Sequence, residues 1–448
     1  MGPSVNVPER FHIETWGCQM NVLDSQRMAG LLKARGWVVS AEPREADVLV
    51  LNTCSVREKA EAKVYSELGR FQEWKRENPS HVIGVTGCVA QQEGTEILDR
   101  VPYVDFVLGT GNVERLPEAI AAARDGRRAA MLELDADSPV YQFRAIERGS
   151  AFQAFVTVIE GCDQFCTFCI VPFTRGRERS RRAGEIETEV RELVAGGYTE
   201  VTLLGQTVNV YACPESGTTL AGLLRRLGKI DGLRRLRFIT SHPAFVTEDL
   251  TEAIAETPAV SRFFHLPAQS GSDRVLNRMK RRYTSGRYLA ILASVRARIP
   301  DIAFSSDFIV GFPGETEEDF RQTLALVEEA RFASLFGFLY SPRPGTAASR
   351  WGSAAAVSNE AAAQRLERLL SLQKRIQLEA HRTLEGETME VLVEGHSRIG
   401  ATLSGRTRCN RIVHFDPGSA LAPIGAGDYV RIRIETGLEN SLRGCVAS

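Results

Sequence analysis

The sequence predicts an α/β protein with three parts: a doubly wound α/β domain over residues 1–145, a partial (βα)6 barrel over 146–380, and a small antiparallel β-barrel over 381–448. In the first two parts, short apolar runs alternate with helical patterns, which is typical of parallel sheets covered by helices. Six runs in the second part end in polar or Gly/Pro-containing loops, which favours a barrel. The last part holds short strands separated by Gly-rich turns.

The first domain is predicted from four strand candidates, which read FHIETWG, ADVLVLNT, HVIGVTG and VDFVLG. After the first of them, LDSQRMAGLLKARG predicts a helix because Met28, Leu31 and Leu32 share one face and Gly36 is typical of a helix stop. We expect this domain to end near the stretch LDADSPVYQF.

The central domain is predicted from six strand candidates, which read FVTVIEG, EVTLLGQ, RLRFITS, RFFHLPA, FSSDFIVG and LFGFLYS. Helical stretches fill most of the gaps between them. A long helix follows over NEAAAQRLERLLSLQKRIQLEA, where Leu366, Leu369, Leu370 and Ile376 form one apolar stripe. The runs ETMEVLVE, RIVHF and DYVRIRIE then predict a barrel of the kind that binds oligonucleotides.

Composition places the chain among ordinary globular proteins. Of its 448 residues 43% are hydrophobic and 25% charged, and the net charge of -1 excludes a general attraction to nucleic acid or membranes. No apolar run reaches the roughly 20 residues of a membrane helix, and the first residues lack the pattern of a signal peptide. We therefore expect a cytoplasmic protein, in which nine cysteines are better explained as metal or redox ligands than as disulfides.

Cys162, Cys166 and Cys169 have the spacing C-x3-C-x2-C directly after a predicted strand. Thiolates bind iron or zinc, but a structural zinc site requires four ligands, and no fourth Cys or His lies nearby in the sequence. A 4Fe–4S cluster held by three thiolates leaves one iron open to a small molecule. The alternatives are an incomplete zinc site or three unrelated thiols.

Cys18, Cys54 and Cys88 are distant in the sequence but occur in similar contexts, TWGC, LNTC and VTGC. Each closes a predicted strand, and the ends of neighbouring parallel strands lie along one edge of a sheet, so the three thiols can converge. Nearby helix N-termini would favour thiolates and an anionic cluster. Three buried, inert cysteines are an equal alternative from the spacing alone.

These motifs resemble a known family. The C-x3-C-x2-C loop is the pattern of the radical S-adenosylmethionine (radical SAM) enzymes, and TWGCQMNVLDS resembles the opening motif of the methylthiotransferases. Further similar motifs read LGQTVN, HLPAQSGSD, MKRRYT, DFIVGFPGET and YSPRPGTAA. The resemblance covers the whole chain and implies a methylthiotransferase N-terminal domain, a radical SAM domain and a C-terminal TRAM domain. Thr207 stands where the family often has Asn, and Cys213, Cys409 and Cys445, which lie outside both triads, are interpreted as ordinary thiols.

The resemblance also implies the cofactors and the reaction. Each triad would hold a 4Fe–4S cluster, so the six cysteines would carry the catalysis. SAM would serve as methyl donor and radical source, with Phe168 near its adenine. The GCQMN motif is similar to the branch that adds a methylthio group to carbon 2 of N6-dimethylallyladenosine, next to the tRNA anticodon.

Other functions remain open from the sequence. Within the same chemistry, the alternatives are methylthiolation of a ribosomal protein or of threonylcarbamoyladenosine in tRNA. A non-enzymatic alternative is an RNA-binding iron–sulfur sensor. For the enzyme we expect a monomer that receives electrons from a donor such as flavodoxin or ferredoxin and binds the anticodon stem-loop of tRNA.

Polar residues at the predicted strand ends are further cofactor-binding candidates, since a barrel directs such residues to its open face. They are Gln206, Asn209, Ser241, Gln269 and Asp307, the last together with Glu315. The alternative for each is a helix cap or a loop contact.

Two groups of arginines predict an RNA surface, because Arg contacts to phosphate supply affinity independent of base sequence. Arg398, Arg406, Arg408 and Arg411 lie in the last part of the chain, and a run between Arg175 and Arg182 follows the C-x3-C-x2-C loop. The alternatives are internal salt bridges, a solvated surface, or contact between the second group and the SAM carboxylate.

Overall fold

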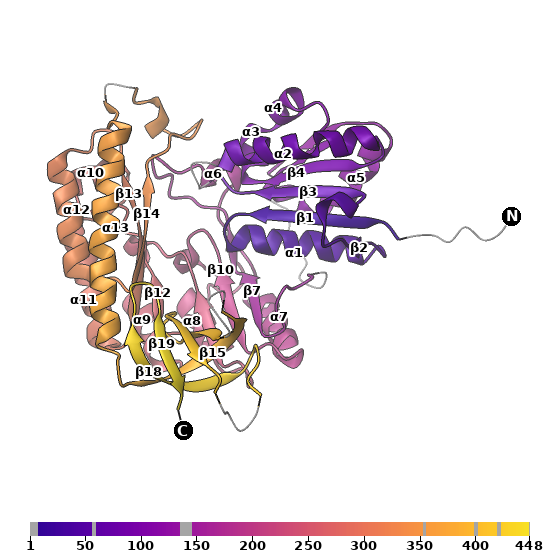
Figure 1. Cartoon of the computed structure of the whole chain (residues 1–448). Coiled ribbons are helices and arrows are strands. Elements are labelled where there is room, and N and C mark those ends of the chain that lie inside the picture. The colour runs from indigo at the N-terminus through magenta and orange to yellow at the C-terminus, as the bar shows by residue number, and fades with distance from the viewer. Residues whose placement is uncertain are drawn as a thin grey trace. The chain divides into compact units, whose positions relative to one another are not determined.

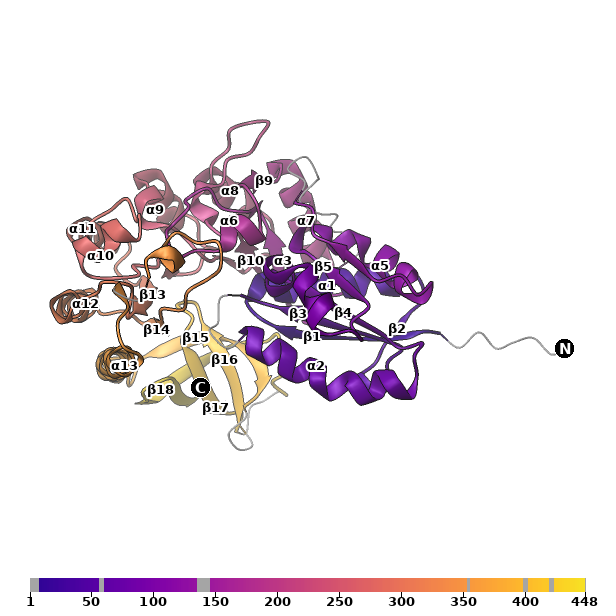
Figure 2. The same cartoon turned by 90° about the horizontal axis from the view of Figure 1, so that it is seen from above.

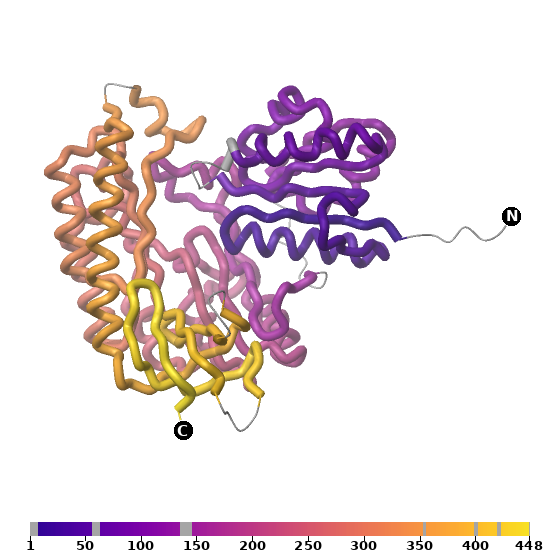
Figure 3. The backbone as a smooth tube through the Cα atoms, in the orientation of Figure 1, coloured from indigo at the N-terminus to yellow at the C-terminus, as the bar shows by residue number. Residues whose placement is uncertain are grey.

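The computed structural model describes residues 8–55, 60–134, 146–352, 355–397, 402–418 and 423–447 (Figures 1 and 3). The chain forms two compact units, which are described separately. Unit 1 comprises Met1–Ser150, Ile159–Phe165 and Cys169–Ser180, and unit 2 comprises Ala151–Val158, Cys166–Phe168 and Arg181–Ser448.

Unit 1 is built on a six-stranded sheet in the order β2-β1-β3-β4-β5-β6, with every pairing parallel. Its strands are β1 (Arg10–Trp16), β2 (Val38–Val39), β3 (Val48–Thr53), β4 (Val82–Gly87), β5 (Phe106–Leu108) and β6 (Ala129–Met131). The four strands that the sequence predicts are β1, β3, β4 and β5. The two short strands β2 and β6 lie at the two ends of the strand order.

Helices cover both faces of this sheet, which confirms the doubly wound arrangement. Alternate residues of β3 belong to opposite cores: Val48 and Val50 pack with α1 (Gln19–Lys33) and α5 (Leu116–Arg124). On the other face, Leu49 and Leu51 pack with three helices, and Figure 1 shows α1 and α2 on opposite sides of the sheet. These helices are α2 (Ala60–Glu77), α3 (Cys88–Glu93) and α4 (Thr95–Arg100).

Unit 2 contains the predicted partial barrel of six parallel strands. They form two hydrogen-bonded groups, β7-β10-β11 and β12-β13-β14. The groups adjoin where Leu236 pairs with Val260 and where the Ser241 N–H donates to the His265 carbonyl at 3.4 Å. The strands are β7 (Gln153–Thr157), β10 (Glu200–Leu204), β11 (Arg235–Phe238), β12 (Phe263–His265), β13 (Ala303–Val310) and β14 (Ser334–Leu339).

Helices follow the barrel strands, and the predicted long helix is α13 (Asn359–Arg382), whose Leu369 and Ile376 are fully buried. Figures 1 and 2 both show α13 beside α12. The helices between the strands are α7 (Ala183–Ala195), α8 (Leu220–Leu227), α9 (Glu248–Glu256), α10 (Asp273–Arg278), α11 (Ser285–Arg298) and α12 (Glu317–Ala330). No helix in the described ranges combines the length and apolar composition that crossing a lipid bilayer requires.

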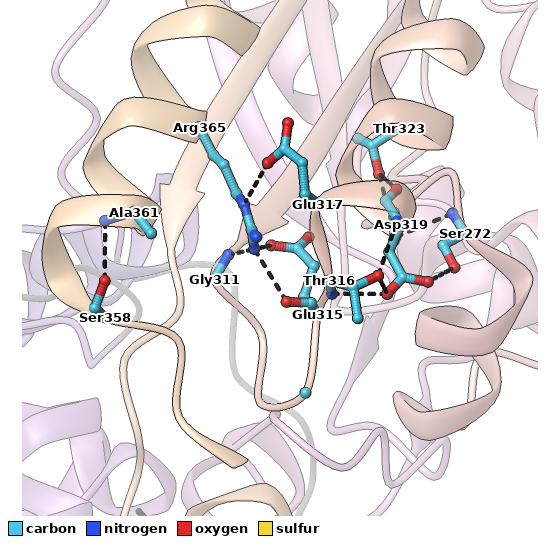
Figure 4. Close-up of polar contacts among 12 residues, drawn as sticks. Ser272, Gly311, Glu315, Thr316, Glu317, Asp319, Thr323, Ser358, Ala361 and Arg365 are labelled. Atoms are coloured by element: carbon cyan, nitrogen blue, oxygen red, sulfur yellow. Dashed lines mark hydrogen bonds and ion pairs between the residues drawn. The ribbon is translucent and has the colours of Figure 1, made fainter. Parts of the chain in front are cut away.

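The loop GFPGET between β13 and α12 is held by buried polar contacts (Figure 4). The Glu315 carboxylate accepts the Gly311 N–H at 2.7 Å and the Arg365 Nη1 of α13 at 2.8 Å. Thr316 and Asp319 form a capping box that begins α12, and Ser272 donates to Asp319 at 2.6 Å. Glu315 therefore links this loop to α13. This contact matches the alternative that Glu315 holds a loop rather than binding a cofactor.

The C-terminal barrel is closed in the order β15-β16-β17-β19-β18 around an apolar core. One of its five pairings, β17 with β19, is parallel, so the barrel is not wholly antiparallel as predicted. The reason is that the last three strands alternate in direction while β19 inserts between β17 and β18. The strands are β15 (Thr388–His396), β16 (Leu403–Thr407), β17 (Ile412–Asp416), β18 (Tyr429–Gly437) and β19 (Leu442–Val446).

This barrel packs against the amino-terminal ends of β10 and β11, within unit 2. The buried Arg235 donates to the Arg406 carbonyl at 2.8 Å, and Arg237 donates to the Thr407 carbonyl at 3.2 Å. These contacts explain why the chain forms two compact units although the sequence predicts three parts. The boundaries at 145 and 380 stay predictions, and residues 135–145 before the first lie outside the described ranges.

Candidate metal centres

The first cysteine triad lies at the carboxyl edge of the unit 1 sheet. Trp16 of β1 pairs with Thr53 of β3, and Thr53 pairs with Gly87 of β4, so the three strands end side by side. Cys54 and Cys88 directly follow Thr53 and Gly87, and Cys18 follows Trp16 after Gly17. The parallel register therefore brings together residues that are 36 and 34 positions apart in the sequence.

The three thiols are linked through Cys54, which contacts both of the others. The Cys54 thiol is hydrogen-bonded to the side chains of both Cys18 and Cys88. The hydrogen bond with Cys54 lowers the pKa of Cys18 to about 6, and the second bond with Cys54 lowers the pKa of Cys88 to about 7. The same two bonds, together with burial, raise the pKa of Cys54. All nine cysteines of the chain are described as free thiols.

An amide pair behind the triad holds two of the cysteine loops together. Asn21 Oδ1 accepts the Cys18 backbone N–H at 3.4 Å and the Cys18 thiol at 3.3 Å. Asn21 Nδ2 donates to Asn52 Oδ1 at 3.1 Å and to the Thr53 carbonyl at 3.2 Å. Both amides are fully buried, so the start of α1 is fixed to the end of β3. Asn21 is the Asn of GCQMN, and sequence reasoning assigned it no role.

Gly87, directly before Cys88, allows β3 and β4 to approach closely at this edge. Its φ is +93°, in the left-handed region, and a Cβ there would lie 2.3 Å from the Thr53 carbonyl oxygen. Only glycine combines this backbone conformation with this contact. The VTGC sequence therefore places the third thiol beside the second.

Arg175 is a further member of this site that sequence reasoning grouped with the RNA-binding arginines. Its Nη2 lies 2.7 Å from Asp24 Oδ2 of α1, and the two side chains are 5% and 3% exposed. The guanidinium also donates a hydrogen bond to the Cys88 side chain, and its charge favours the thiolates of Cys88 and Cys18. The partner on α1 is 151 residues away in the sequence, so no local pattern could indicate the pair.

The second triad lies in one loop that is divided between the units. In unit 1, β8 (Ile159–Glu160) and β9 (Arg179–Ser180) form a short antiparallel pair, and the Cys162 N–H donates to the Gly176 carbonyl at 3.1 Å. Gly161 has φ +79°, and a Cβ there would lie 2.0 Å from the Arg177 carbonyl oxygen. This close approach explains the Gly before Cys162. Cys169 also belongs to unit 1 and lies two residues before the start of α6 (Val171–Thr174).

In unit 2, Cys166 is buried and contacts a buried arginine. Arg281 Nη1 lies 3.5 Å from the Cys166 sulfur. The same guanidinium donates to the Tyr283 hydroxyl and the Pro267 carbonyl, both at 3.0 Å. Arg281 is an arginine of MKRRYT, a motif that pointed to the family but not to this contact.

The predicted cofactor-binding residues lie at the carboxyl ends of the barrel strands or close to them. Phe168 packs against an apolar cluster, and its ring centroid lies 6.4 Å from that of Phe312. Ser241 is buried after β11, and its hydroxyl has no hydrogen-bond partner in the described ranges. Gln206 is half-buried after β10. Their roles in binding SAM stay predictions.

Three other contacts around the barrel end use protein partners. The Asn209 amide makes two hydrogen bonds with the backbone of His242, at 3.0 Å and 2.8 Å. Gln269 adopts φ +70° and donates its N–H to the Asp307 carbonyl at 2.8 Å. The Asp307 carboxylate lies 3.6 Å from His265 Nε2. Asn209 therefore ties two strand-end loops together, as its alternative interpretation proposed.

The arginines after the C-x3-C-x2-C loop mostly form internal ion pairs rather than a free basic surface. In unit 1, Arg179 lies 3.4 Å from Glu160, in addition to the Arg175 pair. In unit 2, the buried Arg181 lies 2.7 Å from Glu189. The prediction of a continuous phosphate-binding run is wrong for these residues because buried carboxylates hold their guanidinium groups. Arg177 and Arg182 are exposed and pair with surface carboxylates.

The predicted RNA-binding arginines of the C-terminal barrel are also partly engaged. Arg408 donates to the carbonyls of Val260, at 2.7 Å, and of Pro258, so it attaches the barrel to the rest of unit 2. Arg406 Nε lies 3.0 Å from Glu394. Arg411 is half-buried, and Arg398 lies outside the described ranges. Their binding to RNA stays a prediction.

The donor set of the first triad suits an anionic iron–sulfur cluster better than a single ion. In the described ranges, no three His, Cys, Asp or Glu side chains are arranged to hold one metal ion. The three sulfurs nevertheless converge, two of them favour the thiolate form, and a buried guanidinium lies beside them. Soft thiolates next to a positive charge fit a cluster with three protein ligands.

Comparison with known proteins identifies the family. Family models match in three stretches: the uncharacterized protein family UPF0004 over residues 10–109, the radical SAM superfamily over 156–327, and the TRAM domain over 382–447. The tRNA-2-methylthio-N(6)-dimethylallyladenosine synthase of Geobacter metallireducens is 49% identical, over 98% of this chain and 98% of the relative. The chain belongs to the radical SAM methylthiotransferase family. The corresponding synthase of Geobacter sulfurreducens is 47% identical, over 97% of this chain and 96% of the relative.

A solved structure supports the fold of this methylthiotransferase. The radical SAM methyltransferase TsrM from Kitasatospora setae matches with a TM-score of 0.57 at 14% identity, over 76% of this chain and 75% of that chain. Membership of the radical SAM superfamily implies a 4Fe–4S cluster and SAM. The predicted family, enzyme class and fold class are thereby confirmed.

Proposed function

We propose that this methylthiotransferase adds a methylthio group to carbon 2 of N6-dimethylallyladenosine, next to the anticodon of tRNA. The observation that carries this proposal is the convergence of Cys18, Cys54 and Cys88 in the same chain as a radical SAM domain. One radical site alone would serve many reactions, whereas two thiol triads suit the transfer of a sulfur-containing group. The names of full-length relatives at 44–49% identity support the nucleoside and the tRNA.

We assign one 4Fe–4S cluster to each triad. When bound, the clusters and SAM supply the one-electron chemistry and the methylthio group. Both are needed to replace a carbon–hydrogen bond on adenine with a carbon–sulfur bond. The protein's own residues hold the thiolates in place and exclude water. Asn21 and Asn52 fix the first triad, and Arg281 donates to Cys166 of the second.

The barrel end offers groups suited to binding SAM. Phe168, within the cysteine loop, presents an aromatic ring, and the buried Ser241 hydroxyl is available as a donor or acceptor. A buried hydroxyl without a partner is costly, which favours its use by a ligand. The Asn209 amide supports this site indirectly, because it holds the backbone of the loop that follows Ser241.

For RNA we propose a face of the C-terminal barrel that differs from the predicted set. Arg431 and Arg433 of β18 and Arg443 of β19 are exposed, and no ion pair with a carboxylate is found for them in the described ranges. Strand β18 pairs directly with β19, so the three arginines lie on two adjacent strands. Such a face suits the phosphates of a stem-loop, which position the RNA for reading elsewhere.

Nucleoside analysis tests the reaction and the substrate. In a strain without this gene, mass spectrometry of digested tRNA should show N6-dimethylallyladenosine in place of its 2-methylthio derivative, and the gene should restore the derivative. Loss of a methylthio group from a ribosomal protein or from threonylcarbamoyladenosine, with the first nucleoside unchanged, would assign the enzyme to an alternative substrate.

Iron content tests the two clusters. Anaerobically purified protein should hold about eight irons per chain, counting about four for each cluster. A content of about four irons per chain, together with full radical cleavage of SAM, would show that the first triad does not bind a cluster.

Salt-dependent binding tests the RNA face. Changing Arg431, Arg433 and Arg443 together to Gln should weaken binding of the anticodon stem-loop and lower the slope of log K against log salt by about two to three, since each phosphate contact contributes about 0.7–0.9. The matched control changes three exposed arginines to Gln: Arg321 of α12, Arg331 directly after α12, and Arg375 of α13. If both variants bind alike, the face does not contact RNA.

Three further expectations stay predictions: flavodoxin or ferredoxin as electron donor, a monomeric state and a cytoplasmic location.

A further inference from the structure

The ion pair between Arg175 and Asp24 is part of a buried charge network in unit 1. Asp24 accepts from two arginines, Arg175 at 2.7 Å and Arg27 at 3.3 Å. Arg27 also lies 3.1 Å from Glu114 and 3.9 Å from Glu160. Asp24 is therefore shared between two guanidinium groups, while Glu114 and Glu160 lie beside Arg27 and Glu160 also acts on the charge of Arg175.

The charge of Arg175 also acts on the first cysteine triad. The guanidinium donates to the Cys88 sulfur, and its charge also acts on Cys18. A buried ion pair is weak evidence for a purely stabilising role, because removing charges from water costs about as much as their attraction returns. The position beside three sulfurs supplies a reason for burying this charge that stability alone does not.

We propose that Arg175 is a positioning residue for the cluster of Cys18, Cys54 and Cys88, and that Asp24 sets how much of its charge the cluster experiences. The proposal rests on the cluster that the proposed function assigns to this triad. A hydrogen bond and a positive charge at a cluster sulfur favour the reduced, more negative form and raise the reduction potential. Arg175 follows Cys169 by six residues, so the segment that carries the second triad also supplies the charge partner of the first.

The two partners of the pair predict shifts of opposite sign. Arg175→Gln removes the positive charge and should make the potential more negative. Asp24→Asn removes the negative charge that competes for Arg175 and should make the potential more positive. A pair that only stabilises the fold would not move the potential in opposite directions.

The test is a redox titration followed by electron paramagnetic resonance. It uses the full-length chain in which Cys162, Cys166 and Cys169 are changed to Ala, so that only the first triad binds iron. At the midpoint of this parent, Arg175→Gln should lower the ratio of reduced to oxidised cluster at least tenfold, which corresponds to about 59 mV for one electron. Asp24→Asn should raise the ratio.

The matched control is Arg177→Gln, the same change two residues away. The Arg177 side chain is 65% exposed and pairs with Asp163 at 3.0 Å, so the potential should not move. Unchanged potentials in both test variants, or shifts of the same sign, would overturn the proposal. If Arg175→Gln binds no iron, the direction of the Asp24→Asn shift decides; if neither binds iron, the pair is structural and the proposal fails. A parent chain without iron would instead contradict the proposed function.

Discussion

The two cysteine triads carry the same kind of ligand but are built in different ways. Cys18, Cys54 and Cys88 come from the ends of three parallel strands, and only the register of the sheet brings them together. Cys162, Cys166 and Cys169 lie within eight residues of one loop. The first site therefore depends on the folded sheet of unit 1, whereas the spacing of the second is set largely by the local chain.

Each triad also has one buried arginine that contacts one sulfur. Arg281, at Cys166, is otherwise bonded to the neutral Tyr283 hydroxyl and Pro267 carbonyl. Arg175, at Cys88, is shared with the carboxylate of Asp24. The comparison teaches that the same residue type can deliver different net charge to two sites, according to its other partners. The following predictions test how far the two sites are independent.

The largest expected effect separates the two sites by their chemistry. Cys54→Ala should abolish the methylthio product and lose about half of the iron, yet retain radical cleavage of SAM, because the second triad is intact. Cys166→Ala should abolish both product and cleavage. Assays of 5′-deoxyadenosine, iron and modified nucleoside measure this, with Cys445→Ala as the cysteine control outside both triads. Loss of SAM cleavage in Cys54→Ala would show that the sites are not independent.

A smaller effect tests the dependence of the first site on the sheet. Gly87→Ala forces a Cβ against the Thr53 carbonyl, so it should destabilise unit 1 by more than about 1–3 kcal/mol and reduce iron at the first triad. Gly126→Ala is the control, since Gly126 also has positive φ, +74°, but no atom lies within 4 Å of the added carbon. Urea unfolding can be followed by tryptophan fluorescence, to which Trp16, Trp37 and Trp74 of unit 1 contribute. Equal losses of stability and iron in the two variants would show that the positive φ, and not the contact with Thr53, causes the effect.

A comparable loop contact exists in each unit. Asn52→Ala removes the Asn21 partner behind the first triad, and Asn209→Ala removes both bonds to His242 in unit 2. Each should cost about 1–3 kcal/mol of stability, because buried backbone or amide groups lose their partners. We expect Asn52→Ala to lower iron at the first triad only and Asn209→Ala to raise the KM for SAM only. A raised KM for SAM in Asn52→Ala, or lost iron in Asn209→Ala, would contradict the independence of the two sites.

The smallest effect is a pH dependence confined to unit 2. Burial lowers the pKa of His242 to about 2, and the Nδ1 of this residue accepts the Ala244 N–H at 3.2 Å. The unfolded chain binds the proton below about pH 6.5, so stability falls as the pH falls below that value, by about 0.8 kcal/mol at pH 6 for one such group. His242→Asn keeps an acceptor and should flatten the stability profile between pH 6.5 and 5. An unchanged slope would show that His242 is not buried as a neutral group.

Much of this protein follows from local sequence patterns. The alternation of apolar strands and helices predicts both α/β parts, and the strand-end contexts TWGC, LNTC and VTGC indicate where the thiols of the first triad can meet. These inferences succeed because strand and helix periodicity is local, and because parallel strands necessarily end at a common edge.

Only the tertiary structure decides the contacts between distant segments. Arg175 and Asp24 are 151 residues apart, Glu315 and Arg365 are 50 apart, and Arg408 reaches a carbonyl 148 residues away. The sequence identifies these residues as charged but cannot show whether solvent, RNA or a buried partner neutralises them. Burial and packing determine that outcome, since the energy of a charge depends on its surroundings rather than on its neighbours in the chain.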